Sequence, residues 1–145
     1  MATYSNFEDL EIWKKARIFC QWVNHVIEDT ALKSNSRLRN QLEGSSGSIM
    51  DNIAEGFERS GNKEFVMYLF YAKGSAGESR SQLYRLFDKG YIGEAEFDKQ
   101  REFLMDLSQQ INRFINYLKK SEHKGWHFKE DQELYIKEAK NFEEE

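Results

Sequence analysis

Polar residues that could take part in acid–base chemistry gather in two short stretches, around Asn52 and Glu55 and around Ser75 and Glu78. A carboxyl group buried in such surroundings has a raised pKa and can transfer protons. Neither a histidine nor a cofactor motif accompanies the two stretches, so they lack the partners that catalysis needs. We therefore expect these four side chains to form hydrogen bonds between helices and to fix the register of the helices.

Two pairs of residues have spacings that suggest a metal site. His25 and Glu28 share a helical face, but a carboxylate di-metal centre needs Glu-x-x-His on two helices together with further glutamates. His123 and His127 flank Gly125 in a stretch without helical periodicity. We predict no metal and no other cofactor.

Two further features suggest reactive chemistry only weakly. Lys73-Gly74-Ser75 has a faint likeness to a phosphate-binding loop, but no strand precedes the glycines and no Gly-Lys-Ser/Thr follows them. The single cysteine, Cys20, lies in an apolar stripe and is predicted to be a small buried hydrophobic residue. The sequence thus predicts neither a nucleotide site nor an enzyme.

Four amphipathic segments position these groups. Apolar residues recur every three or four positions, as in a helix with one buried face, and the chain has no proline to interrupt them. The apolar stripes cover residues 10–27, 38–57, 65–86 and 97–118. Ser5-Asn-Phe-Glu8 fits a capping box at the start of the first helix, and the fourth helix is predicted to begin about Glu94. Because short links make neighbouring helices antiparallel, residues 1–121 are predicted to form an all-α, up-down-up-down four-helix bundle with helices of about 25 residues.

The charges divide the chain into two parts. Residues 122–145 contain eight acidic residues and four lysines, and we predict that they form a short, acidic, helical extension of the bundle. Removing them from the totals of 25 acidic and 21 basic residues leaves 17 of each in residues 1–121. A neutral body has no general attraction for nucleic acid or acidic membranes, so any such contact must be local.

Small residues concentrate at two places that a helical hairpin would bring together. If the second and third helices reverse near residues 60–61, positions whose numbers add to about 121 lie side by side, and residues 44–48 face residues 73–77. Glycine within a helix costs about 0.5–1 kcal/mol relative to alanine, which close backbone approach can offset. We expect a seam for packing the two helices or for receiving another copy of the chain. Its residues are Gly44, Gly47, Asn52, Gly74, Ser75 and Gly77.

The same hairpin predicts a local basic cluster at one end of the bundle, which could contact phosphate groups. Its residues are Lys33, Arg37, Arg39, Arg80, Arg85 and Lys89. Glu43, Glu78 and Asp88 are interspersed with it, and charged residues at bundle ends are commonly just solvated.

Several motifs together resemble a known family. They are Asp9-Leu10 with Trp13, Asn52-Ile-Ala-Glu-Gly56, Phe65, Ala72 with Gly74-Ser75, Glu78 and Gly90-Tyr91. They resemble small bacterial four-helix-bundle proteins encoded in intervening sequences of large-subunit ribosomal RNA genes, which are related to the accessory variability protein of diversity-generating retroelements. The resemblance covers roughly residues 7–118 and implies a homopentameric barrel of bundles. In the retroelement branch it also implies a basic accessory protein that binds nucleic acid and a partner reverse transcriptase.

The chain departs from that branch in its charge. Gln41-Leu-Glu-Gly44 stands where family members commonly carry paired arginines, and the body is neutral rather than basic. We therefore favour a non-enzymatic, homo-oligomeric scaffold or accessory protein that binds another macromolecule, with direct RNA or DNA binding as the alternative. One cysteine, no signal-peptide pattern and no membrane-spanning apolar run predict a cytoplasmic protein without a membrane partner.

Overall fold

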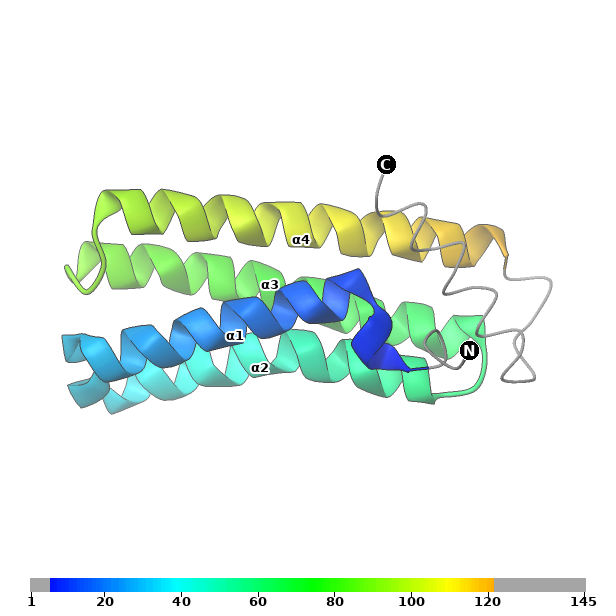
Figure 1. Cartoon of the computed structure of the whole chain (residues 1–145), viewed down its shortest axis with the longest axis horizontal. Helices are drawn as coiled ribbons and strands as arrows, with labels where there is room; N and C mark the ends of the chain where they lie inside the picture. The colour runs from blue at the N-terminus through cyan, green and yellow to red at the C-terminus, as the bar shows by residue number, and fades with distance from the viewer. Residues whose placement is uncertain (1–5, 122–145) are drawn as a thin grey trace.

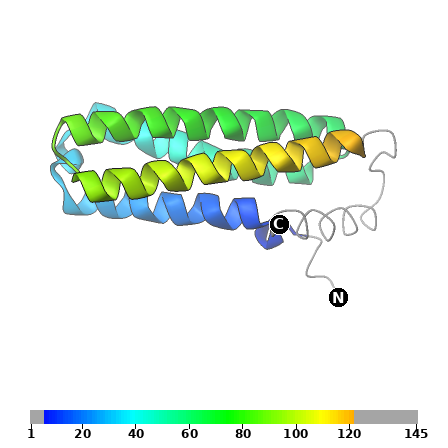
Figure 2. The same cartoon turned by 90° about the horizontal axis from the view of Figure 1, so that it is seen from above.

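The computed structural model describes residues 6–121, and four long helices lie side by side within this range (Figures 1 and 2). Two short 3-10 helices flank the first long helix, and the described part of the chain contains no strand. In chain order the elements are η2 (Phe7–Asp9), α1 (Glu11–Asp29), η3 (Ala31–Ser34), α2 (Ser36–Glu58), α3 (Asn62–Asp88) and α4 (Glu94–Lys120). Consecutive helices run in opposite directions, which confirms the predicted all-α, up-down-up-down bundle.

The helix boundaries follow from capping residues and glycines. Asn35 begins α2 by accepting a hydrogen bond from the Leu38 N–H at 3.2 Å. Gly61 has a φ of 105° and makes the tight reversal between α2 and α3, and Gly90, with a φ of 75°, ends α3. Both values lie in the left-handed region that favours glycine.

The first helix differs most from its prediction. It begins at Glu11 after the 3-10 turn of η2, and its 19 residues make it shorter than the predicted 25 or so. Leu10, at its N-cap position, provides no side-chain hydrogen bond, so the capping box expected to end at Glu8 does not start this helix.

The core lies along the inner faces of the four helices. Phe57 packs edge-on against Phe65, whose ring centroid is 5.5 Å from that of Phe114, so α2, α3 and α4 meet at one end. At the other end Phe97 of α4 contacts the rings of Tyr84 and Phe87 of α3. Each fully buried apolar side chain contributes about 1.5–3 kcal/mol, so this core is the main stabilising element.

The chain ends lie outside this description. The predicted acidic extension at residues 122–145, with His123 and His127, falls outside the described residues. Of the helices that the structure describes, none has the length and apolar character required to cross a membrane.

Candidate functional site

Polar side chains join α2 to α3 at the two small-residue segments. The Ser75 hydroxyl donates to the Ser48 hydroxyl oxygen at 3.0 Å, and this bond links the two helices. The Asn52 amide donates to both the carbonyl and the hydroxyl oxygen of Ser48, each at 2.8 Å. The expected hydrogen bond between helices is confirmed for Ser75, whereas the hydrogen bonds of Asn52 to Ser48 stay within α2, so the prediction for Asn52 is wrong.

A second group of hydrogen bonds lies deeper in the same interface. The hydroxyl groups of Ser45 and Ser79 are 2.8 Å apart, and Ser45 also donates to the Gln82 side-chain oxygen at 2.6 Å. The Gln82 amide in turn donates to the Glu78 carboxylate at 3.3 Å. Because Ser45, Ser79 and Gln82 are buried, each hydrogen bond pairs a polar group whose burial without a partner would cost free energy of folding.

The pairing of the two segments is shifted from the predicted register. Ser48 was expected opposite Lys73 and faces Ser75, and Ser45 was expected opposite Ala76 and faces Ser79. Helical side chains lean toward the N-terminus of their own helix, by about one position. In antiparallel helices the two displacements add, and the numbers of facing residues therefore sum to 123 or 124 rather than 121.

The four predicted seam glycines do not pack against the neighbouring helix. A Cβ atom added at Gly44, Gly47, Gly74 or Gly77 would meet nothing within 4 Å. These glycines lie on the outer sides of α2 and α3, because the inward positions between them are held by the serines. The expectation that they bring α2 and α3 together within one chain is wrong, and their use against another copy remains a prediction.

The close approach occurs at Gly56 instead. A Cβ atom there would lie 2.6 Å from the Tyr68 Cβ and 3.1 Å from the Phe65 Cδ1 atom. The position therefore needs glycine, which explains the last residue of the Asn-Ile-Ala-Glu-Gly motif. Sequence reasoning missed this contact, although a glycine followed directly by the apolar Phe57 near the helix reversal was a signal for it.

Glu55 and Tyr68 form a polar cluster beside this contact. Tyr68 donates a hydrogen bond to the Glu55 carboxylate, and this bond is the main cause of a raised Tyr68 pKa. Arg59 forms an ion pair with Glu55 at 3.4 Å, and its guanidinium lies 5.2 Å from the centre of the Tyr68 ring. The cluster links α2 to α3 near their reversal. None of its three residues is a histidine or a cysteine, so it lacks the groups of a nucleophile–base pair.

The six residues of the predicted basic cluster lie on η3, α2 and α3 or directly after α3, and their joint action stays a prediction. Arg39 donates to the Lys33 carbonyl at 2.7 Å, and the Lys33 ammonium lies 3.6 Å from Glu28. Arg85 donates to the Gln41 side chain at 2.8 Å, so it faces α2. Arg80 instead lines a hollow against α4. The remaining two residues, Arg37 and Lys89, are exposed.

Two open hollows of opposite charge lie on the surface. One, about 470 Å³, lies between α3 and α4 and is lined by Lys73, Arg80, Met105, Ser108, Gln109, Asn112 and Arg113. The other, about 550 Å³, lies along α2 and is lined by Asn40, Glu43, Gly44, Gly47, Ser48 and Asp51. The open glycines of α2 thus lie in an acidic depression.

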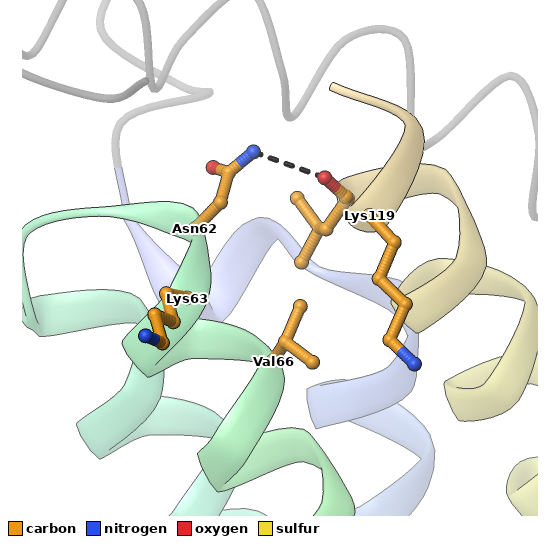
Figure 3. A pocket seen from close by; sticks show the side chains of 5 residues that line it. Asn62, Lys63, Val66 and Lys119 are labelled. Carbon is orange, nitrogen blue, oxygen red and sulfur yellow. Dashed lines mark hydrogen bonds between the residues drawn. The ribbon is translucent and has the colours of Figure 1, made fainter. Parts of the chain in front are cut away.

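A third pocket lies where α3 begins and α4 ends (Figure 3). Its volume is about 210 Å³, below the range of about 300–1,000 Å³ typical of small-molecule sites. Asn62 is 3% exposed and donates to the Leu118 carbonyl at 3.1 Å, while Lys63 and Lys119 lie on either side of Val66. We assign the Asn62 hydrogen bond the structural role of joining the two helix ends.

The residues considered for metal binding or thiol chemistry are His25, Glu28 and Cys20. His25 and Glu28 are both exposed on α1. Within residues 6–121, no group of three His, Cys, Asp or Glu side chains could hold a metal ion. Cys20 is half-buried, its thiol donates to the Ser46 carbonyl at 3.2 Å, and burial raises its pKa. A raised pKa keeps the thiol protonated and poorly nucleophilic.

Helix α3 carries most of the exposed large apolar side chains. Phe70 and Tyr71 are 44% and 52% exposed, and Met67, Tyr84 and Phe87 are also exposed. We call Met67, Phe70, Tyr71 and Tyr84 the α3 strip. Gly74 and Gly77 lie between the two ends of the strip in the sequence, with open space where their side chains would be. The α3 backbone therefore has open space beside it between Tyr71 and Tyr84.

These features define a class of protein: an all-α four-helix bundle in which buried serine and glutamine side chains join α2 to α3. The model of the 23S rRNA-intervening sequence protein family matches residues 8–116. The chain belongs to this family, in agreement with the resemblance seen in its motifs. Comparisons with curated proteins and with solved structures found no match.

Proposed function

We propose that the protein is a non-enzymatic, homo-oligomeric helical bundle that serves as a scaffold or accessory factor for another macromolecule. The observation that carries this proposal is the α3 strip, where four large apolar side chains of one helix face solvent. Contiguous exposed apolar surface marks sites of protein–protein contact. The family description names no enzymatic activity, which is compatible with a binding role.

The open glycines favour a helix of a second copy of the chain as the binding partner of the α3 strip. Since nothing lies within 4 Å of a Cβ atom at Gly74 or Gly77, a partner helix can approach the α3 backbone closely. Phe70 and Tyr84 then flank the contact on either side. Close approach increases dispersion contacts and offsets the helix-propensity cost of the glycines.

A pentamer, which the family resemblance implies, imposes a further condition on the surface. In a closed ring of five, each copy contacts its neighbours through two different patches. The hollow of α2 that contains Gly44 and Gly47 is the second patch in this proposal, because it too offers open space beside a helix backbone.

Direct nucleic-acid binding through the predicted basic cluster is the weaker candidate. Arg85 and Arg80 face different neighbouring helices, and Lys33 is paired with Glu28. Cations that face different helices on a neutral body give little cooperative attraction for a phosphate backbone.

The test is the mass of the assembly in solution. Light scattering after size-exclusion chromatography should give a multiple of the 17.2 kDa chain mass for the wild type. The double variant Phe70→Ser/Tyr71→Ser should shift toward the monomer, because both substituted residues are exposed and the core is untouched. Ile18→Ser is the matched control, since Ile18 is 53% exposed on α1, and it should keep the wild-type mass. A monomeric wild type at high concentration would refute the proposal.

A further inference from the structure

The hollow between α3 and α4 has an unusual set of lining residues. It contains three cationic side chains, Lys73, Arg80 and Arg113, and no carboxylate. Ser108, Gln109 and Asn112 add neutral hydrogen-bonding groups, and Met105 adds an apolar surface that is 37% exposed. Its volume of about 470 Å³ falls within the range of sites that accept small molecules.

The cations of this hollow have no counter-ions among the described residues. Within residues 6–121, the ion pairs of at most 4.0 Å involve Lys14, Lys15, Lys33 and Arg59 as the cations. The Nε atom of Arg113 is buried and makes no hydrogen bond. A buried donor without a partner costs about 1–3 kcal/mol, more when it is charged, so an acceptor that reached this atom would be stabilising.

The hollow is held open by rigid elements. At one end of the hollow, the rings of Phe65 and Phe114 join α3 to α4. At its other end, the Tyr84 ring contacts the Phe97 ring. Between these contacts the lining residues include the small Ser108. A site built on two long helices keeps its side-chain origins fixed when a ligand binds.

We propose that this hollow binds the phosphate group of a nucleotide-sized ligand. Guanidinium groups match phosphate oxygens through paired hydrogen bonds, and a lysine adds a point charge, so two arginines and a lysine suit a phosphate better than a single carboxylate. The hollow is larger than a phosphate requires, and the amides of Gln109 and Asn112 can bind the remainder of the ligand. The neutral body adds no long-range attraction, so recognition is local to these side chains.

The test compares two triple variants that remove the same charge from different places. The first variant removes all three cationic side chains from the hollow and is Lys73→Gln/Arg80→Gln/Arg113→Gln. The second removes three cationic side chains elsewhere and is Lys33→Gln/Arg39→Gln/Lys89→Gln. The probes are fluorescent ADP, a labelled single-stranded RNA of ten nucleotides, and pyrophosphate as the competitor. Fluorescence anisotropy is measured at low and at physiological salt. A double variant, Lys73→Gln/Arg80→Gln, replaces the first triple variant if loss of Arg113 impairs folding.

We expect the wild type to bind at least one labelled probe, pyrophosphate to displace it, and the hollow variants to bind at least tenfold more weakly. The control triple variant should bind within about twofold of the wild type. Preference for ADP identifies a free nucleotide as the phosphate source, and preference for RNA identifies a strand. An equal loss in both triple variants, or no binding of either probe by the wild type at low salt, overturns the proposal.

Discussion

Replacing Gly56 with alanine tests the closest contact between α2 and α3. The added Cβ atom would lie 2.6 Å from the Tyr68 Cβ, whereas carbon atoms pack best at about 3.5–4.0 Å. The overlap is therefore roughly 1 Å. The Tyr68 Cβ is bonded directly to the backbone and cannot rotate away, so the helices themselves must separate at this point.

The expected free-energy change combines two opposing effects. Overpacking in a well-packed interior costs about 1–3 kcal/mol, and the backbone-bound position of the clashing atom puts Gly56→Ala near the upper limit. Alanine regains up to about 1 kcal/mol of helix propensity. We expect a net loss of about 2 kcal/mol in the free energy of unfolding.

Urea unfolding followed by circular dichroism measures this change. With a denaturant dependence near 2 kcal/mol per molar, the midpoint for Gly56→Ala should fall by about 1 M. Gly44→Ala is the control in the same helix, because its Cβ would meet nothing within 4 Å. It should raise the stability by about 0.5–1 kcal/mol. All chains are compared at a concentration at which light scattering shows monomers, since self-association would shift the midpoint and Gly44 lies in the proposed second patch. Equal midpoints for Gly56→Ala and the wild type would refute the reasoning.

Two further predictions concern polar groups. Ser45→Ala leaves Gln82 and Ser79 without their shared partner and should cost about 1–3 kcal/mol in urea unfolding, whereas Ser81→Ala, at an exposed position, should change the stability by less than about 0.5 kcal/mol. A loss no larger than that of Ser81→Ala would contradict the buried network. Because burial raises the Cys20 pKa, iodoacetamide should alkylate the folded protein at pH 8 more slowly than the urea-unfolded chain. Equal rates would show that the thiol is neither shielded nor held in its protonated form.

The sequence predicted the architecture because its signals were strong and repeated. The apolar stripe of residues 97–118 places the fourth helix, which begins at Glu94 as expected. The polar break and the glycine at position 61 place the reversal between α2 and α3. The start of α1 was predicted less well, because a serine followed by a glutamate three residues later fits a helix start while the chain forms a 3-10 turn first.

The function of individual small residues was harder to predict. Periodicity shows that residues 44–48 are helical, but the direction in which Gly44 points depends on where the neighbouring helices lie. A glycine and a buried serine are both small, so composition alone does not separate Gly44 from Ser45. The basic hollow was missed for a related reason. Arg80 and Arg113 lie on different helices, far apart in the sequence, and only the packing of α3 on α4 brings them together.

The two kinds of glycine in the α2–α3 hairpin place different limits on how this protein can change. Gly56 is fixed by the fold, because every larger side chain collides with the next helix. Gly44, Gly47, Gly74 and Gly77 are tolerant in the isolated chain, because a side chain at these positions would extend into open space. Mutation can therefore remodel the outer face of the hairpin while its interior stays constant, so that new binding specificities can evolve without loss of the fold.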